Sequence, residues 1–164
     1  MVQQNQLLVN LLAKFTEEEI RTKIVAHAKS WVGTPYMHHS LVKGKGGGVD
    51  CAMLLVGVYA EAGIVGLDFE PRPYSPQWHL HRNEEEYLKI VVSYSHIIDE
   101  INVLPGDIVL FKIGRLFAHG GIIVNWPNII HARNPGNVFM DNVLLNNTGK
   151  HALANVERKF FSLF

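Results

Sequence analysis

The sequence contains little cysteine and no excess of charge of either sign. Cys51 is the only cysteine among 164 residues, so no disulfide can form within the chain. Lysine plus arginine and aspartate plus glutamate number 15 each, which makes the formal net charge zero. Nucleic-acid-binding proteins usually carry a basic excess or a basic stripe. The composition therefore excludes a disulfide framework, and we expect no nucleic-acid partner.

Long apolar runs are also missing. No segment approaches the roughly 20 apolar residues that a membrane-spanning helix needs. The stretch "LLVNLL" at 7–12 has no positive charges before it and no small-residue cleavage site, so a secretory signal is not expected. We therefore expect no membrane span and synthesis in the cytoplasm, with other export routes left open.

The residues that are present suit one folded domain across 1–164, because 48% are hydrophobic and the length allows a sizeable core. The first half reads as helical. Thr16 and Glu19 form a possible capping box, and Gly33 with Pro35 ends that helix. Further helices are expected over 51–62 and from Asn83 onward.

The second half changes to short β-type runs separated by turns. The expected strands carry the sequences "IVLFKI", "HGGIIVNW", "NIIHAR", "NVFMDNV" and "NVERKFFSLF". Helices followed by strands predict an α+β domain, with N-terminal helices packed on a C-terminal antiparallel sheet.

Cys51 stands where a glycine-rich loop turns into an apolar, helix-patterned run. Asp50 is a good N-cap residue, which places the thiol in the first helical turn. The partial positive charge of a helix N-terminus favours thiolate over thiol. The alternative is a small, inert core cysteine. Position alone does not separate these two interpretations.

Two histidines are candidate partners for the thiol. His119 begins an apolar strand, and His131 follows on the next strand after the turn "WPN". If these strands form a hairpin, the histidines lie close enough for a base and a residue that orients it. Gly120 and Gly121 allow another backbone or a substrate to approach. Each histidine taken alone is more often a structural residue at a strand end, and only the wider pattern favours a catalytic role.

The other histidines and glycines give no clear cofactor signal. His38 with His39, and His79 with His81, lack an H-x-x-x-H pair, a C-x-x-C motif or paired acidic residues. "KGKGGG" lacks the G-x-x-x-x-G-K-[ST] order of a phosphate-binding loop. We therefore expect no metal and no organic cofactor.

Taken in order, "WVGTPY", a Gly-rich loop, "DC", "LPGDIVLF", "AHGGIIV" and "IIHA" resemble the NlpC family of papain-like cysteine peptidases, which cleave peptidoglycan stem peptides. The resemblance spans about 26–132. Ala52 and Met53 stand where Ser and Gly are usual, and Gly120 replaces a usual Val. "YMHHS" replaces an aromatic and two glycines, which puts the substrate preference in doubt.

The resemblance implies a papain-like fold and a triad of Cys51 as nucleophile, His119 as general base and His131 as the residue that orients it. Its expected substrate is the γ-D-glutamyl–diamino-acid bond of a peptidoglycan stem peptide. The residues expected to border the substrate are Tyr36, Asp50, His38 and Gly120, and Tyr36 would donate a hydrogen bond.

The segments "PYSPQWH" and "HGGIIVNWPNIIHA" look similar to phage-associated members of the family. That similarity implies phage tail proteins as partners, and carriage on a virion or delivery to the cell wall. Two alternatives stay open: an amidase or acyltransferase on the same fold, and a non-catalytic binding or tail-assembly module with an inert thiol.

Overall fold

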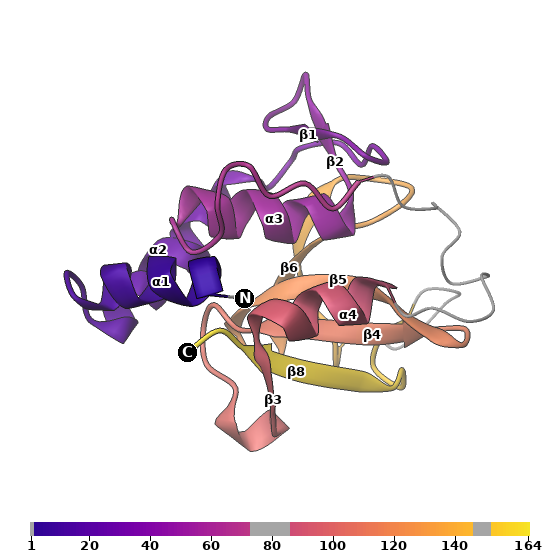
Figure 1. Cartoon of the computed structure of the whole chain (residues 1–164). Coiled ribbons are helices and arrows are strands. Elements are labelled where there is room, and N and C mark those ends of the chain that lie inside the picture. The colour runs from indigo at the N-terminus through magenta and orange to yellow at the C-terminus, as the bar shows by residue number, and fades with distance from the viewer. Residues whose placement is uncertain (1, 73–85, 146–151) are drawn as a thin grey trace.

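The computed structural model describes residues 2–72, 86–145 and 152–164 (Figure 1). Its α-helices precede the main sheet along the chain. The helices are α1 (Val2–Leu12), α2 (Glu17–Ser30), α3 (Cys51–Glu61), α4 (Glu86–Tyr94) and the short 3₁₀ helix η2 (Glu100–Asn102). None of the described helices is both long and apolar enough to cross a bilayer.

The main sheet has six strands, and every neighbouring pair in it is antiparallel. In spatial order they are β3 (His96–Ile98), β8 (Arg158–Ser162), β4 (Ile108–Ile113), β5 (Leu116–Asn125), β6 (Asn128–Ala132) and β7 (Val138–Asn142). The predicted α+β class with an antiparallel sheet is confirmed. The strands β5 and β6 form the predicted hairpin around "WPN".

The start of α2 follows the expected capping box. Thr16 Oγ1 accepts a hydrogen bond from the Glu19 backbone N–H at 3.2 Å, and Glu19 Oε2 accepts one from the Thr16 N–H at 2.8 Å. Two of the orphan N–H groups of the first turn are thereby satisfied. Ile20, Ile24 and Ala28 then recur at helical spacing and are buried in the core.

The sheet is apolar on both faces, which explains why its central strands read as continuous hydrophobic runs. One face, with Leu110, Ile122 and Ile130, packs in the larger core with α2, α3 and α4. The other face, with Phe111 and Ile129, belongs to a second cluster. Strand alternation sends successive side chains to these two opposite cores.

Some elements differ from expectation. The helix α4 begins at Glu86, and Asn83, its expected cap, lies outside the described residues. The helix α1 was not expected. The glycine-rich segment 38–49 contains a small hairpin of β1 (Leu41–Val42) and β2 (Gly48–Val49) rather than only a loop. This hairpin is formed by backbone hydrogen bonds, and the side-chain pattern of the segment does not predict it.

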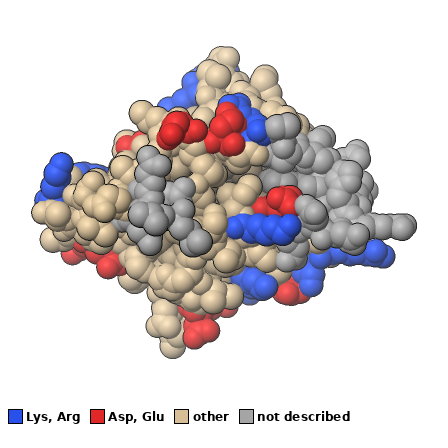
Figure 2. Space-filling model, viewed as in Figure 1, with Lys and Arg blue, Asp and Glu red and all other residues tan. Residues whose placement is uncertain are grey.

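Charged side chains are dispersed on the visible surface. Figure 2 shows acidic and basic groups interspersed on the face viewed, with neither sign forming a continuous field. This dispersion agrees with the equal numbers of acidic and basic residues in the sequence.

Candidate active site

The thiol lies on the first residue of α3, as the sequence predicted. Asp50 is extended (φ −99°, ψ 178°), and its Oδ1 accepts hydrogen bonds from the N–H groups of Ala52 (3.1 Å) and Met53 (2.9 Å). This N-cap starts the helix at Cys51. The Cys51 residue is only 7% exposed. The thiol at the start of this helix is therefore almost completely buried rather than exposed on the surface.

The second oxygen of the Asp50 carboxylate holds the preceding loop. Asp50 Oδ2 accepts the backbone N–H of His39 at 2.8 Å and lies 3.3 Å from His38 Nδ1. The two histidine rings stack with centroids 3.7 Å apart, and Arg72 donates to the His39 carbonyl at 2.6 Å. With Asp50 only 1% exposed, this carboxylate organises the loop around the thiol. A direct substrate contact by Asp50 or His38 stays a prediction.

The segment that contains "GTPY" runs between β2 and the loop that precedes β7. On one side, the Tyr36 N–H donates to the Gly136 carbonyl at 2.9 Å; on the other, the Val49 N–H donates to the Pro35 carbonyl at 3.0 Å. These two hydrogen bonds place Tyr36 next to the N-terminus of α3. Burial of the phenol, together with the nearby charges of Cys51 and Asp50, raises the pKa of Tyr36 well above its usual value. Tyr36 therefore borders the thiol.

The backbone of β5 lies against Cys51. The strand register passes from Phe111↔His119 to Lys112↔Phe117, so Ala118 is an extra residue in a β-bulge. The Ala118 carbonyl lies 4.0 Å from Cys51 Sγ. The bulge therefore stands directly before His119 and brings the strand backbone against the thiol.

The two candidate histidines meet as predicted. His119 Nε2 and His131 Nδ1 lie 2.8 Å apart, a hydrogen-bond distance, and connect β5 to β6. His131 is fully buried, whereas His119 is partly exposed. A Cβ on Gly121 would stand 2.7 Å from Ile129 Cδ1 and 3.3 Å from His131 Cβ. The close approach allowed by this glycine is to a neighbouring strand and its histidine.

The thiol and the base do not meet directly. Across the described residues, no hydrogen bond joins Cys51 Sγ to the His119 ring. The His119 ring instead lies beside Phe111, with ring centroids 6.1 Å apart, and its near neighbour Gly120 faces Tyr87. Catalytic hydrogen bonds are often long in structures without substrate and tighten when it binds. The roles of Cys51, His119 and His131 stay predictions.

Burial controls the protonation of the site. It raises the pKa of the Cys51 thiol to about 12, with help from the Asp50 charge, while N–H groups of Gly120, Cys51 and Ala52 oppose the rise. This direction is opposite to the one expected from the helix N-terminus alone. Desolvation of a thiolate outweighs the partial charges of the first turn. The resting thiol is therefore neutral.

Both histidines are neutral as well. Burial, then the charges of His131 and Arg133, hold the pKa of His119 well below its usual value. Burial also lowers the pKa of His131, where the Asp141 carboxylate acts in the opposite direction and Arg133 adds to the lowering. The site thus holds a thiol and two uncharged imidazoles, rather than a thiolate and an imidazolium.

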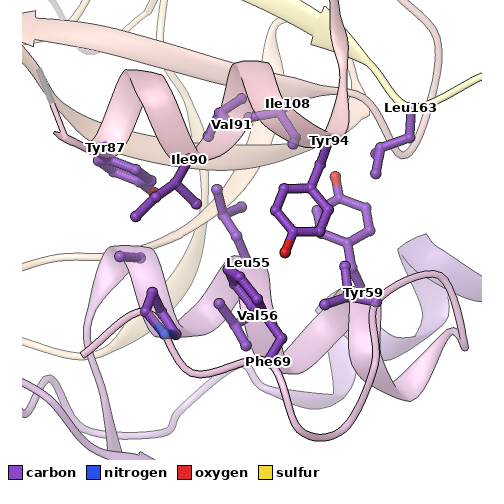
Figure 3. Close-up of a pocket in the computed structure, with 13 residues that line it drawn as sticks. Leu55, Val56, Tyr59, Phe69, Tyr87, Ile90, Val91, Tyr94, Ile108 and Leu163 are labelled. Atoms are coloured by element: carbon purple, nitrogen blue, oxygen red, sulfur yellow. The ribbon is translucent and has the colours of Figure 1, made fainter. Parts of the chain in front are cut away.

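An apolar pocket adjoins the turn that carries the thiol, between α3 and α4 (Figure 3). Its cavity volume is small, about 50 Å³, and the pocket is partly open to solvent. Ala52, where Ser is usual in the resembling family, is one of the residues that line the pocket, and Met53 is fully buried in the core. The lining includes Leu55, Val56 and Tyr59 of α3 and Tyr87, Ile90, Val91 and Tyr94 of α4.

Within the part of the chain that the structure describes, no group of three or more histidine, cysteine, aspartate or glutamate side chains is arranged to hold a metal ion. His79 and His81 lie outside the described residues.

No protein-family model matches the sequence, and no curated protein sequence matches it either. Solved structures do match. The NlpC/p60 domain of the peptidoglycan hydrolase SagA is 20% identical with a TM-score of 0.54, covering 85% of this chain and 96% of that one. The chain has the NlpC/P60 fold.

Two further structures with this NlpC/P60 fold extend the comparison. NlpC1 from Trichomonas vaginalis is 21% identical with a TM-score of 0.54, and the match covers 74% of this chain and 38% of that one. RipD from Mycobacterium tuberculosis is 13% identical with a TM-score of 0.55, covering 88% and 98%. RipD is described as a non-catalytic domain adapted to peptidoglycan binding. The predicted papain-like fold is therefore confirmed.

Tyr87 and Asp141 are two site neighbours that sequence reasoning missed. The Tyr87 hydroxyl donates to the Cys51 carbonyl at 3.1 Å, and Asp141 Oδ2 lies 3.6 Å from His131 Nε2. Tyr87 lies in a helix that reads as an ordinary amphipathic segment, and Asp141 in an outer strand, so neither carries a local signal.

Proposed function

We propose that this chain is a cysteine peptidase of the NlpC family that hydrolyses amide bonds in peptidoglycan stem peptides. The observation that carries the proposal is the position of Cys51 at a capped helix start, against the strand whose His119 is bonded to His131. The NlpC/P60 fold of the peptidoglycan hydrolase SagA supports the substrate class. The family resemblance narrows the bond to γ-D-glutamyl–diamino acid.

The reaction begins from a neutral thiol and a neutral base, because burial disfavours both charged forms. The Cys51 sulfur attacks the amide carbonyl carbon while His119 takes the thiol proton, and backbone N–H groups at the α3 N-terminus stabilise the oxyanion. His119 then gives the proton to the leaving amine as the carbon–nitrogen bond breaks. Water, deprotonated by His119, hydrolyses the thioester and frees Cys51.

Substrate has to bring the thiol and the imidazole together in this mechanism, since the resting site holds no hydrogen bond between Cys51 and His119. Tyr36, which borders the thiol, would donate a hydrogen bond to the bound peptide.

The similarity to phage-associated members extends the proposal to phage tail proteins as partners and to delivery at the cell wall.

Purified peptidoglycan and a synthetic L-Ala–γ-D-Glu–diamino-acid peptide test the proposal. Wild-type protein is expected to release a fragment with a new amino terminus, detected by mass spectrometry, and Cys51→Ser is expected to release none. Folded wild-type protein that cleaves neither substrate would refute the peptidase. Transfer of the acyl group to an added amine without hydrolysis would indicate an acyltransferase instead.

Non-catalytic peptidoglycan binding is the second candidate. It is favoured by the raised pKa of the Cys51 thiol and by the structural match to RipD. Sedimentation with insoluble peptidoglycan separates the candidates: this alternative expects wild type and Cys51→Ser to bind equally and neither to release fragments.

A further inference from the structure

One nitrogen of the buried histidine pair points at a carboxylate on the outermost strand. His131 is 0% exposed, and its Nδ1 is occupied by His119. Its Nε2 is buried without a hydrogen-bond partner among the described residues and lies 3.6 Å from Asp141 Oδ2. That separation is longer than an ordinary N–H···O hydrogen bond, but the Asp141 carboxylate still acts on the ring, since it opposes the lowering of the His131 pKa that burial causes.

Strand register explains how Asp141 reaches this nitrogen. On the β6–β7 ladder, His131 pairs with Phe139, and Asp141 stands two residues further along β7. Residues two apart on a strand share a face, so Asp141 is the diagonal neighbour of His131. The Asp141 side chain is 12% exposed, which keeps its charge poorly screened by water.

The charge of Asp141 selects one arrangement of protons. A neutral imidazole carries one N–H and one bare nitrogen, whereas an ionised carboxylate only accepts. The His131 nitrogen that faces Asp141 is therefore Nε2–H, and its Nδ1 is bare. A bare His131 Nδ1 accepts from His119 Nε2–H, which leaves Nδ1 of His119 bare. That atom is the one able to receive a proton from a thiol.

We propose that Asp141 is a positioning residue that sets the tautomers of both histidines and so leaves Nδ1 of His119 as the base. This inference rests on the proposed peptidase for its kinetic consequence. A second charged group, Arg133, follows β6, acts on both rings and disfavours their protonated forms. Arg133 thus keeps the pair neutral, and Asp141 decides which nitrogens hold the protons.

Two substitutions in the full chain distinguish this role from simple packing. Asp141→Ala removes the carboxylate and is expected to lower kcat/KM by about 10- to 100-fold. Asp141→Asn keeps the shape of the side chain but removes its charge, and its amide can turn either its oxygen or its N–H toward His131 Nε2, so it no longer selects one tautomer. We expect Asp141→Asn to lower kcat/KM by about tenfold or more, because only the charge imposes the proton order. An Asp141→Asn variant as active as wild type would show that the residue only packs and overturns the proposal.

Ring-¹⁵N histidine labelling gives a readout that does not need activity. In wild type, His131 Nε2 is expected to show the shift of a protonated nitrogen and Nδ1 that of a bare one. In Asp141→Asn, which lacks the charge, each nitrogen is expected to show a shift averaged over both tautomers. A wild-type His131 protonated at Nδ1 refutes the proposal even if the variants fold poorly. If wild type shows the expected tautomers but cleaves no peptide, the proposed peptidase activity is refuted while the proposed role of Asp141 stands. Asp99→Asn, at an exposed carboxylate without a side-chain capping bond, is the matched control.

Discussion

The hydroxyl of Tyr87 occupies the space that a side chain on residue 120 would need. A Cβ on Gly120 would fall against Tyr87 Oη and stand 2.9 Å from Leu110 Cδ2, nearer than real Cβ atoms come. The same hydroxyl donates to the Cys51 carbonyl at 3.1 Å. The resembling family usually has Val at position 120. Here the absence of a side chain on Gly120 leaves room for the Tyr87 hydroxyl, which holds α4 against the turn that carries Cys51.

Gly120→Ala is expected to lower the free energy of unfolding by about 1–3 kcal/mol, because the new methyl group overpacks a filled site. Tyr87→Phe removes the nearest atom and is expected to recover part of that loss in the double variant. Urea unfolding of the four proteins gives the coupling free energy, expected to be at least about 0.5 kcal/mol. Strictly additive effects would contradict the complementarity. Gly46→Ala, with no atom within 4 Å of its Cβ, is the control.

The Cys51 thiol is expected to react slowly with iodoacetamide at neutral pH. Its pKa of about 12 leaves little thiolate, so labelling at pH 8 should be at least about tenfold slower than that of a free thiol. The rate should keep rising above pH 9. Asp50→Asn removes a negative charge beside the sulfur and is expected to accelerate labelling at fixed pH. An ordinary titration near pH 8.5, the same in wild type and in His119→Ala, would contradict this account.

The stability of the fold is expected to fall below about pH 6.5. His119 and His131 have lowered pKa values in the folded state, so the unfolded chain binds more protons once the pH drops below its own histidine value. Stability is full above that pH and is lost as the pH falls, by up to about 1.4 kcal/mol per pH unit for each histidine. Asp141 weakens the shift of His131, and Arg133 lowers the pKa of both.

Urea unfolding between pH 5 and 7 measures this dependence. The double variant His119→Gln with His131→Gln is expected to flatten it, whereas His96→Gln, at an exposed position on the edge strand β3, leaves it unchanged. An unaltered slope in the double variant would show that other groups cause the acid sensitivity.

Arg21→Ala is expected to cost about 3–5 kcal/mol of stability, because it leaves the buried Asp107 without its cation. Arg21 Nη1 lies 2.8 Å from Asp107 Oδ1, and Nη2 donates to Ser162 Oγ at 3.1 Å, which connects α2 to β8 and to the residue before β4. Glu17→Gln, which removes the half-exposed partner of the same guanidinium, should cost below about 1 kcal/mol. Chemical unfolding compares the two; equal losses would contradict a specific role for the buried pair.

Much of the frame was predictable because its signals are local. Thr16 with Glu19, and Asp50 before an apolar run, mark helix starts through bonds made within three residues. The turn between His119 and His131 pairs their strands, so the contact between the two rings was also predictable. Tyr87 and Asp141 were not, since each reaches the site from an element that local patterns do not place there.

By itself, the sequence determined that the only thiol begins a helix and that two histidines stand on adjoining strands. Hydrogen bonds and strand pairing over short distances along the chain impose both facts. Only the tertiary structure decided how those groups are protonated and held. Three features depend on segments distant in sequence that pack together and exclude water. They are the desolvation of Cys51, the proton order of the histidine pair that Asp141 favours, and the fit of Tyr87 against Gly120.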